Sequence, residues 1–354
     1  MISPRKALSI VLVVLMLAAV LTACAKPPVA PPAVEQPPAP RNVSINIATA
    51  TTGGVYYPLG NTLAQIWTNN VKGVRAAAQA TAGTPQNIEL MQNKEVDIAF
   101  GQNGIAYYAY TGTGTYAGKA VTNIRGMLAL YPNVMHIVAA KNASIKTVAD
   151  FEGKRVVPGA VASATEINSR EIFGAFGLNY RSEAGPTNLR ADYVGYNEAA
   201  DLMKDGHVQG AQIAGGLPTA AVMDVMSAGV AELLSLGDAE IKTIVEKYPW
   251  YFPITIPANT YPNQPNEIRT VAVSNILLVR QDLDDQLVYD LTKAVYDYSA
   301  DFVAGHQAAK GATLQNAMNG MIIPVHPGAA KFFREKGIAV PDRSEERRVG
   351  KQCR

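Results

Sequence analysis

The sequence predicts an α/β fold whose sheets are largely parallel. Strand-like and helix-like segments alternate from residue 43 onwards, and the alternation restarts near Arg155. Alternating units of this kind favour parallel strands with helices packed on their faces. The body, residues 43–341, is long enough for two domains, and two similar α/β halves fit that length better than one.

The first half is expected to begin with a strand, a glycine turn and a helix. The strand covers residues 45–50, where Ile45 and Ile47 lie on one face. Gly53 and Gly54 permit positive φ and a close approach of a ligand to the backbone, and Pro58 suits the first position of a helix. The following pattern predicts a strand at 74–80, a helix at 85–94, and strands at 96–100, 127–130 and 134–140.

The second half repeats this order and leads into a long amphipathic helix. It is expected to contain strands at 155–157, 192–195, 208–213 and 231–236, and helices at 165–176, 198–205 and 218–228. Strands at 134–140 and 271–279 are expected to cross between the halves. A helix over 283–302 is expected to pack back on the first half, because apolar residues recur every three or four positions. Those residues are Leu283, Leu287, Leu291, Ala294, Tyr298 and Phe302.

Four helix starts suggest a binding site for a small anion. Besides the turn at 53–58, Thr84 is a candidate N-cap before Pro85, Ser163 and Glu166 are expected to form a capping box, and Pro218 suits a helix start. Helix N-termini present N–H donors and a partial positive charge. Because the carboxyl ends of parallel strands share one edge, two helix starts from each half can face one cleft. Each turn alone is equally typical of an empty cap.

The N-terminal segment predicts export and membrane attachment. Arg5 and Lys6 precede an apolar run at 7–21, which is typical of a secretory signal. The sequence ending at Cys24, Leu-Thr-Ala-Cys, resembles a bacterial lipobox, which implies cleavage before Cys24 and lipidation of its thiol. A plain cleaved signal or an N-terminal anchor is the alternative. Seven prolines between residues 27 and 40 predict an extended spacer. We therefore expect a signal peptide at 1–23, a lipidated cysteine and tether at 24–42, and an extracytoplasmic, lipid-anchored protein.

Composition argues against several other functions. The highly charged segment 342–354 differs from the body and is interpreted as a non-native tail. The formal charge of +2 includes +2 from Arg5 and Lys6 and +3 from residues 343–354, which leaves −3 for the body and no argument for nucleic-acid binding. The four histidines, His136, His207, His306 and His326, have no metal-ligand spacing. Ser163 lacks a hydrolase elbow, and the turn at Gly53 matches no nucleotide-binding loop. We expect neither an enzyme nor a cofactor.

Several strings resemble the TAXI family of solute receptors, which serve TRAP (tripartite ATP-independent periplasmic) transporters. The string at 51–60, TTGGVYYPLG, resembles the beginning of that family. Further matches are ATAGTPQN at 80–87, EVDIAFGQ at 95–102, DFEGKRV at 150–156 and HPGAAKFF at 326–333. The resemblance covers about residues 43–341. It implies a two-lobed type II periplasmic-binding-protein fold, with two mostly parallel sheets flanked by helices and a hinge of crossover strands. Lobe 1 would be residues 43–134 and 272–341, and lobe 2 residues 135–271.

The resemblance also implies a function and a set of ligand contacts. The receptor would capture a small carboxylate or amino acid, similar to glutamate or 2-oxoglutarate, by hinge closure, and deliver it to a TRAP membrane permease. The implied contacts are Thr52, Gly53, Gly54, Tyr56, Thr84, Gln102, Ser163, Thr165 and Gly216. Tyr56 would either stack on the ligand or pack in the core.

Further candidate contact residues and alternative functions remain. Arg155 and Arg170 are minor candidates for a carboxylate partner, and Tyr251 is a minor candidate for the cleft wall. The family's glycine-rich turn reads GAVASAT at 159–165, so that Ala162 and Ala164 replace glycines and leave the preferred ligand open. A receptor for an ATP-driven importer or a sensor kinase is the alternative function. A lipid-tethered adhesin without a closable cleft is a third.

Overall fold

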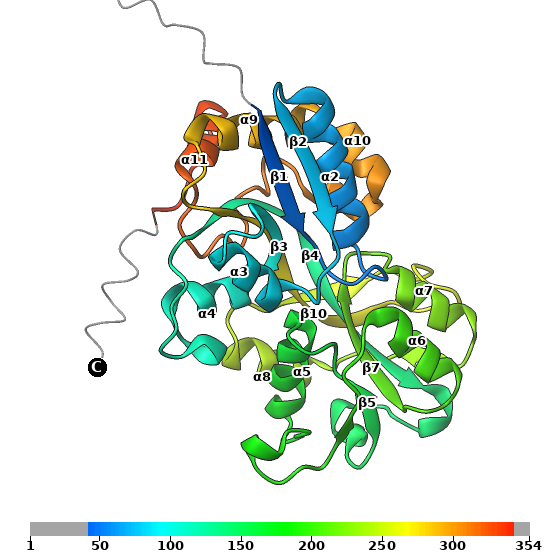
Figure 1. The fold of residues 1–354 in the computed structure, drawn as a ribbon. Helices are drawn as coiled ribbons and strands as arrows, with labels where there is room; N and C mark the ends of the chain where they lie inside the picture. The colour runs from blue at the N-terminus through cyan, green and yellow to red at the C-terminus, as the bar shows by residue number, and fades with distance from the viewer. Residues whose placement is uncertain (1–41, 343–354) are drawn as a thin grey trace, which may run out of the picture. The chain divides into compact units, whose positions relative to one another are not determined.

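The computed structural model describes residues 42–342, which belong to one compact unit, Arg41–Arg354. The predicted signal peptide, Cys24, most of the tether and the tail from residue 343 lie outside the described residues. Among residues 42–342, no helix is long and apolar enough to cross a membrane. The predicted α/β class is confirmed, with helices on the faces of the sheet (Figure 1). The expectation of two mostly parallel sheets is not met, because the described strands form one ten-stranded sheet in which antiparallel strand pairs outnumber parallel ones. The division into two lobes stays a prediction.

Parallel strands make up the first half of the sheet. β1 (Val43–Ala48) lies between β2 (Val74–Gln79) and β3 (Ile98–Gln102) and pairs in parallel with both. The connecting helices are α2 (Tyr56–Asn70), α3 (Thr84–Gln92) and, after β3, α4 (Asn103–Thr111). α4 was not predicted. In α2, Leu59, Leu63 and Trp67 recur at helical spacing and are fully buried against the sheet.

Two long antiparallel strands join the halves. β4 (Ile124–Ala140) and β10 (Ile268–Arg280) lie side by side in the order β2-β1-β3-β10-β4-β7-β5-β6. The segments predicted separately at 127–130 and 134–140 are therefore one strand with an irregularity. Ser274 pairs with Pro132 and Ile276 with Ala129, so two β4 residues face Asn275 alone. This is a β-bulge, which bends a strand and redirects its side chains.

The second half combines parallel and antiparallel pairs. Its strands are β5 (Arg155–Val157), β6 (Arg190–Ala191), β7 (Gly210–Gly215), β8 (Ala231–Leu233) and β9 (Phe252–Ile256). Its helices are α5 (Ala164–Ala175), α6 (Tyr196–Lys204), α7 (Ala220–Ser227) and α8 (Asp238–Lys247). β5 pairs in parallel with β6 and β7, while β7 and β8 run antiparallel to β4, and β9 to β10. β9 and α8 were not predicted.

Two predictions in this half are wrong. The strand expected at 192–195 lies instead at Arg190–Ala191. Gly195, expected to end the strand, is the N-cap of α6. Pro218 does not begin a helix. It follows Leu217 through a cis peptide bond, and α7 starts at Ala220.

The helix predicted at 283–302 is two helices. α9 (Asp285–Asp297) ends at Tyr298, and α10 (Ser299–Gly305) begins directly after it. Leu287 and Leu291 are buried as predicted, but Tyr298, the non-helical residue between the two helices, is 37% exposed. An unpredicted helix, α11 (Pro327–Glu335), packs on α9, where Phe332 stacks on Tyr296 at 5.5 Å between ring centroids. Short 3₁₀ helices occupy Gly114–Tyr116, Lys141–Ala143, Val148–Phe151, Ser182–Ala184 and Gln307–Gly311.

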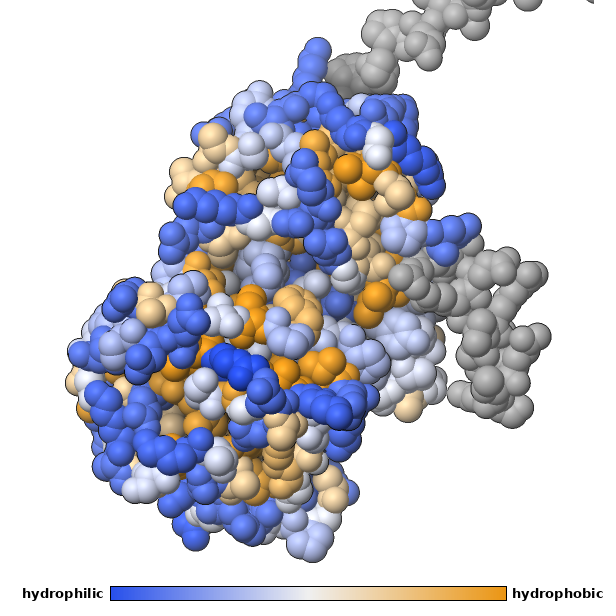
Figure 2. All heavy atoms as spheres, turned by 180° about the vertical axis from the view of Figure 1, so that it is seen from behind, coloured by the Kyte–Doolittle hydropathy of each residue, from blue (hydrophilic) through white to orange (hydrophobic). Residues whose placement is uncertain are grey.

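Buried apolar side chains form four clusters that divide near the bulge. Two clusters draw on residues 45–131 and 276–333, with Ala164 and Ile167 added from α5. The other two draw on residues 134–273. The first half of the sheet thus depends on residues far apart in the sequence for its core. On the face seen in Figure 2, hydrophilic residues occupy much of the rim, with hydrophobic residues between them.

Candidate functional site: a cavity at five helix starts

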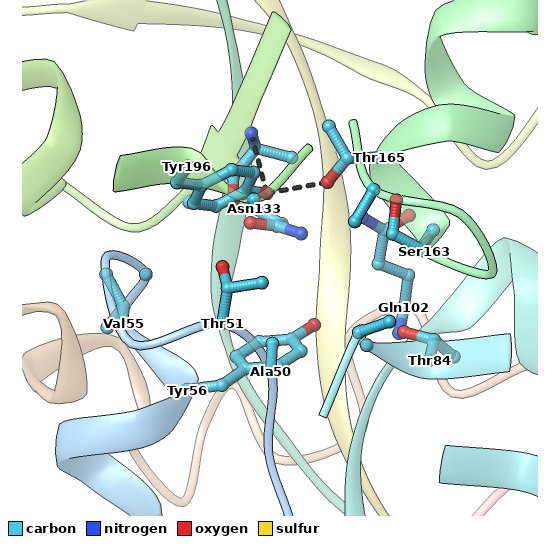
Figure 3. A pocket seen from close by; sticks show the side chains of 18 of the residues that line it. Ala50, Thr51, Val55, Tyr56, Thr84, Gln102, Asn133, Ser163, Thr165 and Tyr196 are labelled. Atoms are coloured by element: carbon cyan, nitrogen blue, oxygen red, sulfur yellow. Dashed lines mark hydrogen bonds between the residues drawn. The ribbon is translucent and has the colours of Figure 1, made fainter. Parts of the chain in front are cut away.

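A cavity lies where the β1–α2 turn, the end of β3, the bulge in β4 and the starts of α5 and α6 meet (Figure 3). Its empty volume is about 480 Å³, including open solvent at the mouth. It is lined by Ala50, Thr51, Gly54, Val55, Tyr56, Ala82, Gly83, Thr84, Gln102, Tyr131, Asn133, Ala160, Ser163, Ala164, Thr165, Gly195, Tyr196, Ala214 and Gly215. The lining residues come from both halves of the sheet.

Five of the lining residues are helix N-caps. They are Val55, Gly83, Gln102, Ser163 and Gly195, which precede α2, α3, α4, α5 and α6. The first-turn N–H groups of a helix have no partner carbonyl within that helix, and its N-terminus carries a partial positive charge. Asp, Glu, Lys, Arg and His are absent from the described lining. The arrangement therefore attracts an anion through backbone dipoles and hydroxyls.

Residues next to helix starts in one half of the sheet lie close to residues at helix starts in the other half. A Cβ built on Gly83, before α3, would lie 3.8 Å from the Ala164 nitrogen in the first turn of α5. Gly83 has a φ of 124°, a conformation suited to glycine. A Cβ on Gly54, before α2, would lie 3.4 Å from the ring of Tyr196, the first residue of α6. Each pair joins the two halves of the sheet.

Two hydroxyls are oriented by backbone groups. The Thr84 hydroxyl accepts a hydrogen bond from the Gln102 N–H at 3.1 Å, and the Ser163 hydroxyl accepts one from the Glu166 N–H at 3.1 Å. Each hydroxyl keeps its own hydrogen for another partner. Ser163 is an N-cap as predicted, whereas Thr84 is the first residue of α3 and Gly83 is the cap.

Tyr196 is a lining residue that the sequence interpretation missed. Its hydroxyl donates to the Ala214 carbonyl at 2.8 Å and accepts from the Ala214 N–H at 3.1 Å. The Thr165 hydroxyl lies 2.6 Å away and is therefore the donor in that contact (Figure 3). These bonds fix the start of α6 against the end of β7. The available signal was Gly195 followed three residues later by Glu198, whose carboxylate accepts from the Gly195 N–H at 3.3 Å.

Three lining side chains have polar atoms without a partner. They are the Thr51 hydroxyl, the Gln102 amide oxygen and the Tyr131 hydroxyl. Gln102 is 3% exposed and Tyr131 is 5% exposed. Buried polar atoms normally have hydrogen-bond partners. These atoms are therefore candidates for contact with a bound molecule.

The bulge places Tyr131 and Asn275 beside the cavity. The Tyr56 hydroxyl donates to the Asn275 amide oxygen, while the Asn275 amide nitrogen has no partner. The Tyr56 ring also packs on Phe100, with centroids 5.0 Å apart, so Tyr56 both lines the cavity and belongs to the core. Burial raises the pKa of Tyr56 and of Tyr131 well above the usual range, which keeps both phenols neutral.

The structure brings six of the nine predicted contacts to this cavity. These are Gly54, Tyr56, Thr84, Gln102, Ser163 and Thr165. The other three do not contribute to its lining. Thr52 is exposed and accepts from the Asn197 amide at 3.4 Å, and the Gly53 carbonyl accepts from the Ala221 N–H at 3.3 Å. Gly216 packs closely on the Tyr131 ring, where a Cβ would come within 2.9 Å.

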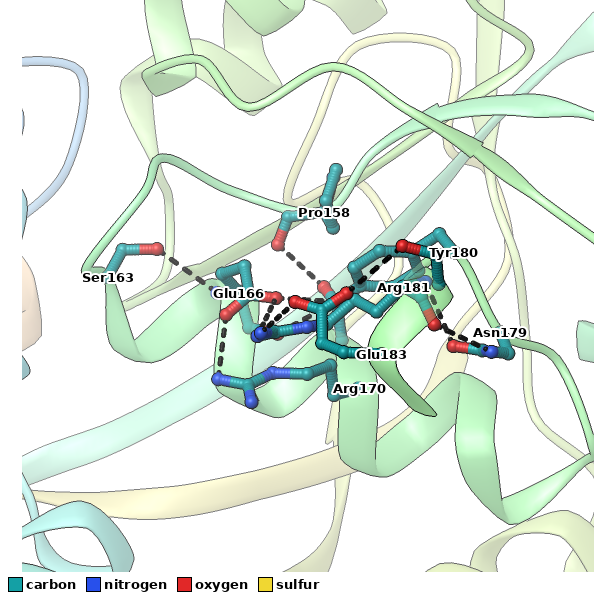
Figure 4. A network of polar contacts seen from close by, with 10 residues as sticks. Pro158, Ser163, Glu166, Arg170, Asn179, Tyr180, Arg181 and Glu183 are labelled. Atoms are coloured by element: carbon teal, nitrogen blue, oxygen red, sulfur yellow. Dashed lines mark hydrogen bonds and ion pairs between the residues drawn. The ribbon is translucent and has the colours of Figure 1, made fainter. Parts of the chain in front are cut away.

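The two candidate arginines lie outside the cavity lining. Arg155 forms a two-point contact with Asp192, with distances of 2.6 and 2.8 Å. Arg170 pairs with Glu166 at 2.8 Å (Figure 4). Each guanidinium has a carboxylate partner, and neither arginine contributes to the lining of this cavity.

The predicted capping box at α5 is only half formed. The Glu166 carboxylate accepts from the Tyr180 hydroxyl at 3.1 Å and pairs with Arg170, and does not return to the Ser163 N–H (Figure 4). That N–H donates to the Ala160 carbonyl at 3.1 Å. The loop before α5 is thus closed on itself, and within it Ala162 has a φ of 59°.

A buried carboxylate connects the halves away from the cavity. Glu171 of α5 accepts from the Tyr251 hydroxyl at 2.7 Å and from the Tyr108 hydroxyl of α4 at 3.1 Å. Trp250 packs on Tyr108, with ring centroids 4.8 Å apart. Burial raises the pKa of Glu171. Tyr251 is 2% exposed and is not part of the cavity lining, so its predicted role in the cleft wall is not supported.

Residues 42–342 contain no group of three or more His, Cys, Asp or Glu side chains arranged to hold a metal ion.

The family of the chain follows from a match over most of its length. A model of the NMT1-like family matches residues 47–337. The chain belongs to the NMT1-like family. All five N-caps at the cavity lie within the matched residues.

Solved structures with some likeness to this NMT1-like chain include solute-binding proteins. The alkanesulfonate-binding protein SsuA from Xanthomonas axonopodis pv. citri, bound to MOPS, is 12% identical, with 84% of this chain and 85% of that chain covered and a TM-score of 0.45. The periplasmic aliphatic sulphonate binding protein SsuA from Escherichia coli is 15% identical, with 89% and 91% covered and a TM-score of 0.45. A ligand-binding component of an ABC-type import system from Staphylococcus aureus, with zinc bound, is 13% identical, with 85% and 95% covered and a TM-score of 0.46.

Proposed function

We propose that this protein is an extracytoplasmic solute receptor that captures a small carboxylate or amino acid by closure of two lobes. The observation that carries this proposal is the cavity itself. Five helix N-caps line it, and the described lining contains no ionised side chain. A carboxylate held by N–H and hydroxyl donors needs no buried lysine or arginine.

Closure is proposed to occur about β4 and β10. These strands join the halves, and their bulge lies beside the cavity, so a change of bend there alters the separation of the opposing helix starts. A ligand bound between α3 and α5 would favour the closed arrangement because it contacts both halves at once.

The partner is proposed to be the membrane permease of a TRAP transporter. The support is the resemblance of residues 51–60 and of the further strings to TAXI receptors. The sequence ending at Cys24 supports a lipid anchor that keeps the receptor at the membrane. A receptor for an ATP-driven importer or a sensor kinase is the second candidate, because the same cavity serves either output.

A thermal-shift screen tests the proposed solute. The full chain is purified, freed of co-purified ligand by denaturant, refolded and screened against carboxylates and amino acids. A ligand at 100 times its dissociation constant is expected to stabilise the folded state by about 2.7 kcal/mol. The absence of any shift, together with no heat of binding by calorimetry, would contradict the proposal.

The anchor is tested separately in cells that make bacterial lipoproteins. The wild-type chain should incorporate radiolabelled fatty acid and sediment with membranes, while Cys24→Ser should do neither. Cys353→Ser, which changes the other cysteine, is the control and should behave as wild type. Equal labelling of wild type and Cys24→Ser would refute lipidation at this residue.

A further inference from the structure

We infer that the ligand is a small carboxylate without an ammonium group, such as a 2-oxo or 2-hydroxy acid, and not an amino acid. This inference rests on the proposed function and narrows it. Its basis is that five helix N-caps line the cavity while the described lining has no carboxylate.

The helix N-termini at the cavity all contribute a positive electrostatic potential. Each helix N-terminus is equivalent to roughly half a positive charge. The starts of α3 and α5 approach each other at Gly83 and Ala164, and those of α2 and α6 at Gly54 and Tyr196. A carboxylate in the cavity is attracted by the helices whose N-caps line it, whereas an ammonium group in the same volume is repelled by them.

An ammonium group would also lack a charged partner. The nearby Glu166 is committed to Arg170 and Tyr180, and the carboxylate of Glu198 accepts from the Gly195 N–H on the exposed side of α6. The carbonyl of Ala214 accepts from Tyr196. A desolvated cation without a counter-charge is strongly disfavoured.

Unpartnered neutral groups remain for a second polar group of the ligand. The Gln102 amide oxygen and the Tyr131 hydroxyl have no partner, and both side chains are more than nine-tenths buried. Figure 3 shows Gln102 on the same side of the cavity as Thr84 and Ser163. A keto oxygen accepts from a phenol such as Tyr131. The Gln102 amide oxygen only accepts, so the hydroxyl of a 2-hydroxy acid is the substituent that can donate to it. These groups suit a neutral oxygen substituent next to the carboxylate.

The test compares acids that differ only at the second carbon. The purified full chain, freed of ligand, is titrated by calorimetry with 2-oxoglutarate, 2-hydroxyglutarate and glutamate, and with pyruvate, lactate and alanine. In whichever of these two series binds, the oxo or hydroxy acid should bind at least tenfold more tightly than the amino acid. An amino acid that binds equally or more tightly overturns the inference and leaves the receptor function intact. If no acid of either series binds, both the inference and the carboxylate assignment fail.

A charge placed in the cavity gives a second readout. Gln102→Glu adds a carboxylate among the helix starts and should weaken binding of the oxo acid by at least tenfold while it weakens binding of the matching amino acid less. Gln79→Glu, the same change at an exposed residue at the end of β2, should leave both affinities unchanged. If Gln102→Glu weakened binding of the oxo acid and of the amino acid equally, the inference would be contradicted, because the added carboxylate would then make no favourable contact with the ammonium group.

Discussion

Single residues at this cavity owe their positions to backbone features that leave little trace in composition. Gln102 and Ser163 were predicted because each follows a strand and precedes a helix, a pattern that is visible in the sequence. Tyr131 and Asn275 were not predicted, because their orientation depends on a bulge where residues more than 140 positions apart in the chain face each other. Tyr196 was missed because the strand before it was placed too far along the chain.

Removal of the Tyr131 hydroxyl tests whether the unpartnered phenol contacts a ligand. Tyr131→Phe is expected to lower affinity for the bound acid about threefold to tenfold, since a hydrogen bond to a neutral oxygen is worth about 0.5–1.5 kcal/mol. The unliganded protein should be as stable as wild type or slightly more stable, because a buried hydroxyl without a partner is removed. Calorimetric titration and urea unfolding measure the two effects.

Tyr296→Phe is the matched control for this change. The Tyr296 hydroxyl is also buried without a partner, but it lies in α9 among Phe332 and Phe333, away from the cavity lining. Its ligand affinity should equal that of wild type. Equal affinities for all three proteins would exclude Tyr131 as a contact.

At the level of elements, helix starts were more predictable than helix ends and strand limits. Caps and prolines mark where α3 and α5 begin, because those residues satisfy local backbone groups. The break between α9 and α10 at Tyr298 has no glycine or proline to mark it, and the apolar repeat continues through it. The loop before α5 shows a third case, in which Ala162 adopts a left-handed conformation that its side chain resists.

Replacement of Ala162 by glycine is expected to stabilise the protein. A left-handed residue with a Cβ costs about 1–2 kcal/mol, and part of that gain is offset by the extra freedom of glycine in the unfolded chain. Ala162→Gly should therefore raise the free energy of unfolding by roughly 0.5–1 kcal/mol in urea titrations. Ala160→Gly, in the same loop but outside the set of residues with positive φ, should lower it. A loss of stability in both variants would show that Ala162 is not strained.

Across the whole molecule, two buried titratable groups link distant segments and give opposite pH dependences. His136 of β4 donates through Nδ1 to the Ile213 carbonyl at 3.0 Å and accepts at Nε2 from the Tyr261 hydroxyl at 2.7 Å. Tyr261 in turn accepts from the Thr219 N–H at 3.0 Å. This chain of bonds holds the turn after β7 against the long strand, and it requires a neutral imidazole.

Protonation of His136 is expected to destabilise the fold. Burial lowers the pKa of His136 from 6.5 to about 4. The unfolded chain therefore binds a proton first, so the free energy of unfolding should fall by about 3 kcal/mol as pH falls from 6.5 to about 4. His136→Gln should flatten this part of the curve, while His207→Gln, at an exposed histidine, should not. A curve that keeps its slope in His136→Gln would refute the assignment.

Glu171 is expected to act in the opposite direction. Burial raises the pKa of Glu171, so the folded state holds a proton that the unfolded state loses near pH 4.5. Its contribution to stability is complete below that pH and is lost as pH rises through the raised folded pKa. Between pH 4 and 8, the free energy of unfolding measured in urea should decrease less with rising pH for Glu171→Gln than for wild type. Glu267→Gln, at an exposed glutamate, should show the same pH dependence as wild type. If all three proteins showed the same pH dependence, Glu171 would not be the group responsible for it.

The position of β10 between β3 and β4 has a consequence for the order in which the chain acquires structure. During synthesis, which starts at the N-terminus, β1, β2 and β3 are made early. The strand that pairs with β3, β10, is made only when residues Ile268–Arg280 have been added. The apolar cluster around α2 also waits for residues as late as Phe333. The segment 134–273 supplies nearly all of its own two clusters and can gather them first. The half that begins the sequence is thus the half completed last, and its uncovered strand edge needs protection until then.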